Sequence, residues 1–347
     1  ATSSSSRRWR SAARAATATC ARACASARTL NPMTMALAGP AGADPLRDMA
    51  LGLFGPLPDA VTEVEGVPVT PALVDLGRVL FFDPRLSAQG QLSCAGCHDL
   101  ASGGDDGRVV MVGQDGTEGL RNTSTVLNAV LNDVHFWDGR EADRALQAGG
   151  PVRAGLALLD APEPMLARLQ AVPGYGDLFL AAFPGEPITA DSLALALEAF
   201  AATLLTPAPF DAWLKGDDSA LSAEAKAGVQ LFNDRGCSLC HYGPMLGGAD
   251  YYPLGLVELP GIDIKAADET AAKEGADEFI FRTAPLRNVA LTAPYFHSGK
   301  VADLAGAVDV MAAGQLGSPL APEETAQIVA FLDSLTGTVQ VAPPVLP

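Results

Sequence analysis

The sequence contains two copies of a Cys-x-x-Cys-His pattern. They are Cys94-Ala95-Gly96-Cys97-His98 and Cys237-Ser238-Leu239-Cys240-His241. Two thiols three positions apart lie on one side of a turn, where both can add to the vinyl groups of one porphyrin, and the His that follows can ligate the iron. One such copy taken alone has the less favoured alternative of a redox dithiol or half of a zinc site. Because both copies end in His, we predict two c-type haems, one per domain, held by all four cysteines with His98 and His241 as iron ligands.

Composition limits the classes of protein that fit. A chain of 347 residues suits two domains that can each bury a core. It has no uninterrupted apolar run of about 18 residues, so we expect no membrane span. The net charge is −17, and the first 43 residues carry six Arg and no acidic residue. The acidic remainder is a poor nucleic-acid binder, and it would either attract a basic partner or simply be a well-solvated surface.

The pattern along the chain predicts a leader and two mainly helical domains. Residues 1–43 are rich in Ser, Ala and Arg without helical or strand periodicity, which indicates an export leader or upstream sequence preceding a start at Met33 or Met35. Cys20 and Cys24 lie in that region, and we assign them no role. Covalent haem attachment implies export, so we expect the periplasm. The expected domains are residues 44–207 and 208–347.

Four helices are predicted from capping residues and apolar spacing. One begins with Thr70-Pro71 and ends at Phe81-Phe82-Asp83-Pro84, and another begins near Thr189. Ser222 should cap a helix that reaches Phe232. Pro322 should open the last helix, with Gly337 as its C-cap. Residues 243–280 are read as a loop. Both domains follow one plan, with a helix, a haem motif, a loop and a closing helix, which suggests a duplication.

Several further blocks resemble the bacterial dihaem cytochrome c peroxidase family, which is related to the dihaem enzyme that matures a tryptophan-derived quinone. The similarity covers about residues 45–340. The blocks are Leu80–Ser87, Arg121-Asn122-Thr123, Phe136–Arg140, Phe210-Asp211, Lys215–Asp218 and the run from Ala284 to Gly299. The resemblance implies two cytochrome c-like domains that reduce hydrogen peroxide to water, with electrons from a small donor such as a monohaem cytochrome c. Family members are often dimers, so a homodimer is an open alternative.

The resemblance also implies roles for particular residues. The haem of His241 would accept electrons and take Met311 as its second ligand, since a thioether raises the reduction potential. Met245 and His297 are the competing ligands. Trp137 matches the aromatic residue between the haems. The family holds a calcium ion whose protein ligands are matched here by Asn122, Thr292 and Pro294. An amide oxygen and two backbone carbonyls suit such a hard cation.

Three positions depart from the family pattern. The slot of the His that caps the first iron in many members is Gln114, so we expect that haem to be open at rest, with Met111 and His135 as alternative ligands. The slot of the acid–base Glu is Ala157, while Gln147 matches a distal Gln that can only hydrogen-bond peroxide. Asp160 and Glu163 could replace the Glu if the loop were rebuilt.

His135 is the third departure. An imidazole there could shuttle protons, but we expect a surface residue beside a buried Trp137. Three functions therefore remain open: a peroxidase, an electron carrier that has lost fast peroxide chemistry, and an oxidase of the quinone-maturation kind. Met311 argues against the last, because that enzyme has a Tyr in this slot.

Overall fold

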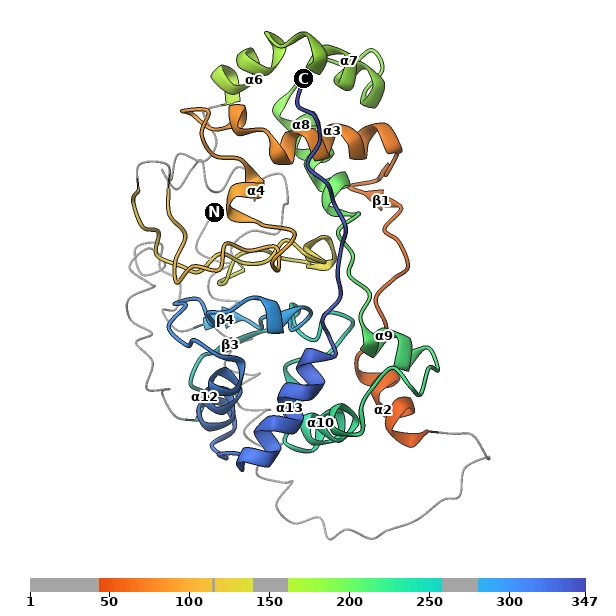
Figure 1. Cartoon of the computed structure of the whole chain (residues 1–347), viewed down its shortest axis with the longest axis vertical. Coiled ribbons are helices and arrows are strands. Elements are labelled where there is room, and N and C mark those ends of the chain that lie inside the picture. Colours follow the sequence, from red (N-terminus) through yellow and green to blue (C-terminus); the bar gives the residue numbers. More distant parts are fainter. Residues whose placement is uncertain (1–43, 114–115, 140–161, 258–279) are drawn as a thin grey trace, which may run out of the picture. The chain divides into compact units, whose positions relative to one another are not determined.

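Figure 1 shows a chain built from helices that are joined by long irregular segments. The structure is a computed structural model that describes residues 44–113, 116–139, 162–257 and 280–347. The predicted leader therefore lies outside the described residues. Internal contacts divide the chain into residues 1–48 and residues 49–347, and the described end of the first unit forms the start of a helix. Within the described ranges, no helix is both long enough and apolar enough to cross a bilayer.

The described elements have the following bounds. The α-helices are α2 (Pro45–Leu53), α3 (Pro71–Phe82), α4 (Cys94–Cys97), α6 (Pro162–Gln170), α7 (Pro173–Ala182), α8 (Ala190–Ala201), α9 (Pro209–Leu214), α10 (Ala223–Asp234), α12 (Leu304–Leu316) and α13 (Pro322–Asp333). Single 3-10 turns are η2 (Pro84–Leu86), η3 (Ala129–Leu131), η4 (Cys237–Leu239) and η6 (Val289–Leu291). The strands are β1 (Glu63–Val64), β2 (Val67–Pro68), β3 (Tyr251–Pro253) and β4 (Ile280–Arg282).

The predicted helix starts are confirmed. The Thr70 hydroxyl accepts a hydrogen bond from the Leu73 amide at the start of α3, with Pro71 in its first turn. The Ser222 hydroxyl caps α10 in the same way, through the Ala225 amide. These side chains satisfy amide groups that have no partner inside the helix. Helix α13 begins at Pro322, but it ends at Asp333 with Ser334 as C-cap, so the prediction for Gly337 is wrong.

Two glycines allow two pairs of helices to cross in close contact. A Cβ atom on Gly77 of α3 would lie 1.8 Å from the Ala196 carbonyl oxygen of α8. A Cβ atom on Gly228 of α10 would lie 1.9 Å from the Gln327 carbonyl oxygen of α13. Each pair thus approaches backbone to backbone, as small residues permit. The two crossings occupy matching places in the two halves, as the predicted duplication requires.

A second repeated feature is a turn that precedes a short 3-10 segment in each half. Asn128 and Asn288 have left-handed φ angles of 58° and 60° before η3 and η6. Each Asn side-chain amide donates a 2.7 Å hydrogen bond to the hydroxyl of Thr206. All three residues are fully buried. Thr206, next to the predicted domain boundary at residues 207–208, is therefore a buried meeting point of the two repeats.

The described part of residues 243–280 is more regular than the sequence indicates. Strand β3 pairs antiparallel with β4, with Tyr252 opposite Phe281. The expectation of a loop throughout this stretch is therefore wrong. The run is rich in Gly and charged residues, and three-residue strands are too short to give a clear period of two. Strand β4 places Phe281 and Arg282 next to the candidate site.

Candidate haem sites

The first Cys-x-x-Cys-His segment forms a single helical turn. Helix α4 contains both cysteines, and the His98 amide closes the turn on the Cys94 carbonyl at 2.9 Å. The His98 imidazole uses Nδ1 to donate to the Gly104 carbonyl at 3.1 Å. Because Nδ1 carries the proton, Nε2 is left as the lone-pair nitrogen. This arrangement fits an imidazole that is oriented to ligate iron.

The second segment repeats this geometry with one difference. Cys237 lies in the 3-10 turn η4, and the His241 amide bonds to the Cys237 carbonyl at 3.0 Å. The His241 Nδ1 donates to the Leu246 carbonyl, again at 3.1 Å. The acceptor is five residues after the His here, whereas it is six residues after His98. Both motifs therefore have the same tautomer and the same outer hydrogen bond.

Electrostatics at the two motifs fit haem attachment better than the alternatives. Burial lowers the pKa of His98 and His241, which favours the neutral imidazole that binds iron. Burial raises the pKa of Cys94 and of Cys237 to about 11, so both remain thiols instead of reactive thiolates. None of the four motif cysteines is in a disulfide. The described ranges also hold no cluster of three metal-binding side chains, as a zinc site requires.

The two residues predicted to serve electron transfer pack on one small apolar cluster. Its buried members are Leu254 and Phe281, and Trp137 and Met311 pack against them. Met311 lies in α12 and Trp137 lies in the turn that follows η3. The fold thus brings together the expected second ligand of one haem and the expected bridging indole.

His297 lies between the rings of this cluster. Its imidazole stacks on Phe281 with ring centres 4.3 Å apart, and it meets Trp137 edge-on at 6.4 Å. Its carbonyl accepts the Asn122 amide at 2.8 Å, while the Trp137 carbonyl accepts the Arg282 amide at 2.9 Å. Each half thus donates one of these backbone amides to a carbonyl of the other half. His297 therefore packs beside Trp137, and its alternative role as iron ligand stays untested.

His135 differs from the expectation. The side chain is only 4% exposed, so the prediction of a surface residue is wrong, and the neighbouring Trp137 is the partly exposed one. The physical reason is the following residue. Phe136 has a left-handed φ of 64°, so the chain turns between His135 and Trp137, which local sequence does not reveal.

The expected calcium ligands lie on two segments that contact each other. Asn122 is buried, and its side-chain nitrogen donates to the Arg108 carbonyl at 2.7 Å, which leaves the side-chain oxygen as an acceptor. Its backbone amide binds the His297 carbonyl, three residues beyond Pro294. Thr292 is the C-cap of η6, immediately before the Ala293–Pro294 peptide. An amide oxygen beside backbone carbonyls is a donor set that fits a hard cation.

The predicted distal residues fall outside the described part of the chain. They are Gln114, Gln147, Ala157, Asp160 and the side chain of Glu163. Met111 is described, and it belongs to a hairpin in which Val112 pairs with Glu118. Its side chain packs on Gly119, where a Cβ atom would come within 2.5 Å of the Met111 side chain. Met111 is therefore held on the hairpin itself.

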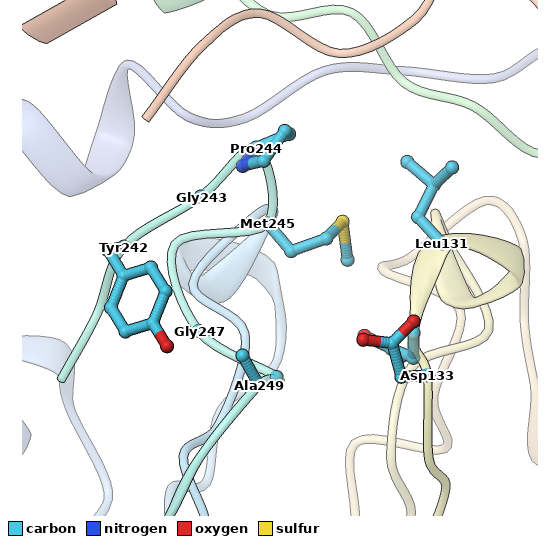
Figure 2. A pocket seen from close by; sticks show the side chains of 10 residues that line it. Leu131, Asp133, Tyr242, Gly243, Pro244, Met245, Gly247 and Ala249 are labelled. Carbon is cyan, nitrogen blue, oxygen red and sulfur yellow. The ribbon is translucent and has the colours of Figure 1, made fainter. Parts of the chain in front are cut away.

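A cavity of about 140 Å³ lies next to the second motif. Residues 131–133 form one wall, and the loop 242–249 that follows His241 forms the other. Figure 2 shows the Met245 side chain extending from that loop toward Leu131 and Asp133. The loop that provides the Leu246 carbonyl thus borders this cavity.

Sequence reasoning missed the buried ion pair between Asp211 and Arg287. Its oxygen–nitrogen distances are 2.7 and 2.9 Å, and Arg287 Nε donates to the Pro244 carbonyl of the same loop at 2.8 Å. Both residues lie in blocks that carried the family resemblance, but an acid and a base far apart in sequence give no signal that they pair.

Comparisons with known proteins agree with this geometry. The sequence model described as "Di-haem cytochrome c peroxidase" matches residues 71–219. The chain is 47% identical to the cytochrome c551 peroxidase of Pseudomonas aeruginosa over 327 residues, which are 92% of this chain and 94% of that protein. It is 35% identical to the methylamine utilization protein MauG of Methylorubrum extorquens, over 80% of this chain and 82% of that protein.

A solved structure is similar as well. It is a MauG-like protein associated with microbial copper homeostasis, with a TM-score of 0.69 and 26% identity, over 81% of this chain and 95% of that one. The chain belongs to the di-haem cytochrome c peroxidase family. It is an oxidoreductase that acts on peroxide, and its family carries two haems.

Proposed function

We propose that the two haems have different tasks in residues 44–207 and 208–347. The first haem, attached at Cys94 and Cys97 and ligated by His98, supplies the redox chemistry that reduces peroxide. Cys237 and Cys240 would attach the second haem, His241 and Met311 would ligate it, and it would supply the entry point for electrons from a small donor such as a monohaem cytochrome c in the periplasm. Trp137 shortens the path between them. The shared packing of Met311 and Trp137 on Phe281 is the observation that supports this division.

The chain's own residues then orient and hold the reacting groups. The outer hydrogen bonds of His98 and His241 fix both imidazoles in the tautomer that leaves Nε2 for iron. The Trp137 indole N–H donates to the Asn122 carbonyl at 2.9 Å, which keeps the ring fixed between the two repeats. Gln147 would hydrogen-bond the bound peroxide. Asn122, Thr292 and Pro294 would hold calcium between the two halves.

The slot of the capping His holds Gln114, so we infer that the first haem needs no prior reduction before peroxide can bind. The test is stopped-flow mixing of the fully oxidised protein with hydrogen peroxide, following the Soret band. Reaction at about 10⁴ M⁻¹s⁻¹ or faster is expected for an open site with a working acid–base group. No reaction, even after one-electron reduction, would indicate an electron carrier that does not reduce peroxide, because Ala157 replaces the family's acid–base Glu.

The acid–base question has its own test. Ala157→Glu places a carboxyl group in the family's acid–base slot, so it should raise peroxidase turnover without changing the number of haems. Ala157→Gln is the matched control, because it has nearly the same shape but cannot accept the proton. Equal turnover in the two variants would mean that another acid already serves.

A further inference from the structure

The buried pair of Asp211 and Arg287 joins four separate segments. The Asp211 carboxylate accepts both guanidinium N–H groups of Arg287, at 2.7 and 2.9 Å. It also accepts the Leu57 amide at 2.7 Å and the Ala208 amide at 2.8 Å. Arg287 uses its remaining Nε–H to donate to the Pro244 carbonyl at 2.8 Å. Every oxygen of the acid is therefore used, and the base reaches the loop after the second haem motif.

That loop carries the carbonyl that His241 requires, and its ends are held by backbone hydrogen bonds, from the Gly243 amide to the Leu53 carbonyl at 2.9 Å and from the Gly248 amide to the Thr283 carbonyl at 2.8 Å. Pro244 lies two residues before Leu246, whose carbonyl accepts the His241 Nδ1–H. The loop also borders the cavity lined by residues 131–133, toward which the Met245 side chain extends (Figure 2). Leu286, the residue before Arg287, donates its amide to the Met245 carbonyl at 3.1 Å. Residues 286–287 thus bond to two consecutive loop carbonyls, those of Pro244 and Met245, immediately before Leu246.

The first half has corresponding backbone bonds but, among its described residues, no such ion pair. The Gly104 carbonyl that accepts from His98 also accepts the Val126 amide at 3.0 Å, and the Gly104 amide donates to the Asp99 carbonyl at 2.7 Å. In the second half the Met245 carbonyl accepts the Leu286 amide, and the Gly247 amide donates to the Tyr242 carbonyl. The turn that begins at Asn128 in the first half corresponds to the one at Asn288, and Leu127 stands where the second half has Arg287. The ion pair is therefore specific to the second motif.

A buried ion pair is expensive to form, and its net contribution to stability is often small. Such a pair is better understood as a device that fixes one geometry. We propose that Asp211 and Arg287 are positioning residues for the second haem. Through the Pro244 carbonyl they hold the 242–249 loop so that the Leu246 carbonyl accepts the His241 Nδ1–H. This inference rests on the proposed assignment of His241 as an iron ligand.

The consequence concerns the reduction potential. An outer hydrogen bond to Nδ1–H makes an imidazole a stronger donor to its metal. If the loop shifts, that bond weakens, the ligand donates less, and the ferrous form is favoured. Loss of either partner should therefore raise the potential of the second haem and leave that of the first unchanged.

Arg287→Lys is the first variant to make, because it keeps the positive charge but loses the fork and the Nε–H. We expect the ferrous-to-ferric ratio of the second haem at a fixed potential to rise several-fold, up to about tenfold. The measurement is optical redox titration of the haem-loaded protein. Arg85→Lys is the matched control, since Arg85 pairs with buried Asp83 far from this loop. It should leave the second haem unchanged.

A charge-neutral double variant separates position from charge. In Asp211→Asn with Arg287→Gln the loop loses its anchor while the net charge is unchanged. If the pair acts by positioning the loop, the potential of the second haem should still rise in the double variant. If the pair acts through its charges, the two changes should cancel and the potential should stay unchanged. The proposal is overturned if the potential of the second haem in both Arg287→Lys and the double variant equals that in the parent protein.

The haem count gives the independent control. A pyridine haemochrome assay on the parent and on each variant reports how many haems are attached. A parent protein with one haem would contradict the proposed function, whereas two haems with unmoved potentials would contradict only the role of Asp211 and Arg287. Asp211→Asn alone is the milder variant if the Arg287 changes prevent folding, and it should raise the same potential.

Discussion

The carboxyl group of Asp105 is buried, which disfavours its charged form. It is 1% exposed, and its Oδ2 has no hydrogen-bond partner among the described residues. Burial, followed by the charges of Asp106 and Asp99, raises its pKa to about 6. The folded protein therefore binds a proton that the unfolded chain releases above about pH 4. Stability from this group is fully present below pH 4 and is lost as the pH rises through 6.

Asp105→Asn should remove this pH dependence. At pH 7 the variant should be more stable than the parent by up to about 3 kcal/mol, since a shift of one pKa unit is worth about 1.4 kcal/mol. At pH 4 the two proteins should be nearly equal. Thermal unfolding at both pH values is the measurement, with exposed Asp133→Asn as control. A stability gain of equal size at both pH values would contradict the reasoning.

The second prediction for a single residue concerns Met311 as a ligand of the second haem. If its thioether is the second ligand of the His241 haem, Met311→His should lower that haem's potential sharply, because imidazole stabilises ferric iron better than a thioether does. Met245→Leu is the control, since Met245 is the competing thioether and lines the cavity. An unchanged potential in Met311→His would remove Met311 from the coordination sphere.

The elements show which parts of the fold the sequence could predict. Local signals were sufficient for α3, α10 and the start of α13, because a hydroxyl cap or a Pro at N1 acts within one turn. The β3–β4 pair, the burial of His135 and the Asp211–Arg287 pair depend on contacts between distant residues or on a left-handed φ. Single-sequence patterns carry no such information. The two haem motifs were visible because their chemistry is local, within five residues.

Helix crossings give a prediction at the element scale. Gly77→Ala and Gly228→Ala should each destabilise the haem-loaded protein by about 1–3 kcal/mol or more, because the new methyl group meets a backbone carbonyl and the helices must separate. The gain of up to about 1 kcal/mol in helix propensity cannot offset that cost. Thermal unfolding is the measurement.

Gly176→Ala in α7 is the control for these crossings. Nothing lies within 4 Å of a Cβ atom there, so only the propensity gain should remain and the variant should be slightly more stable. The crossing argument fails if Gly77→Ala or Gly228→Ala behaves like Gly176→Ala.

On the scale of the whole molecule, the C-terminal segment links the second half to the first. Figure 1 shows it running from α13 to the region of α3 and α7. Val339 and Val341 pack on the core formed by Phe81, Leu100, Leu127, Phe200 and Leu204. The Pro347 carbonyl accepts a hydrogen bond from Arg85 at 3.1 Å. At the start of this segment, the Gly337 amide donates to the Asn288 side chain at 2.9 Å, beside Thr206.

Thr206 is the point where both repeats and this segment meet, so it tests whether the two halves form one cooperative unit. Thr206→Val keeps the shape but removes the oxygen that accepts from Asn128 and Asn288. Two buried amide groups then lose a partner, at about 1–3 kcal/mol each. We expect the unfolding transitions of both haem domains, followed separately by their Soret bands, to fall together. Thr206→Ser retains the hydroxyl and should cost only about 1 kcal/mol for the lost methyl group. If Thr206→Val lowers the stability of one half alone, the two repeats unfold independently and this buried junction does not couple them.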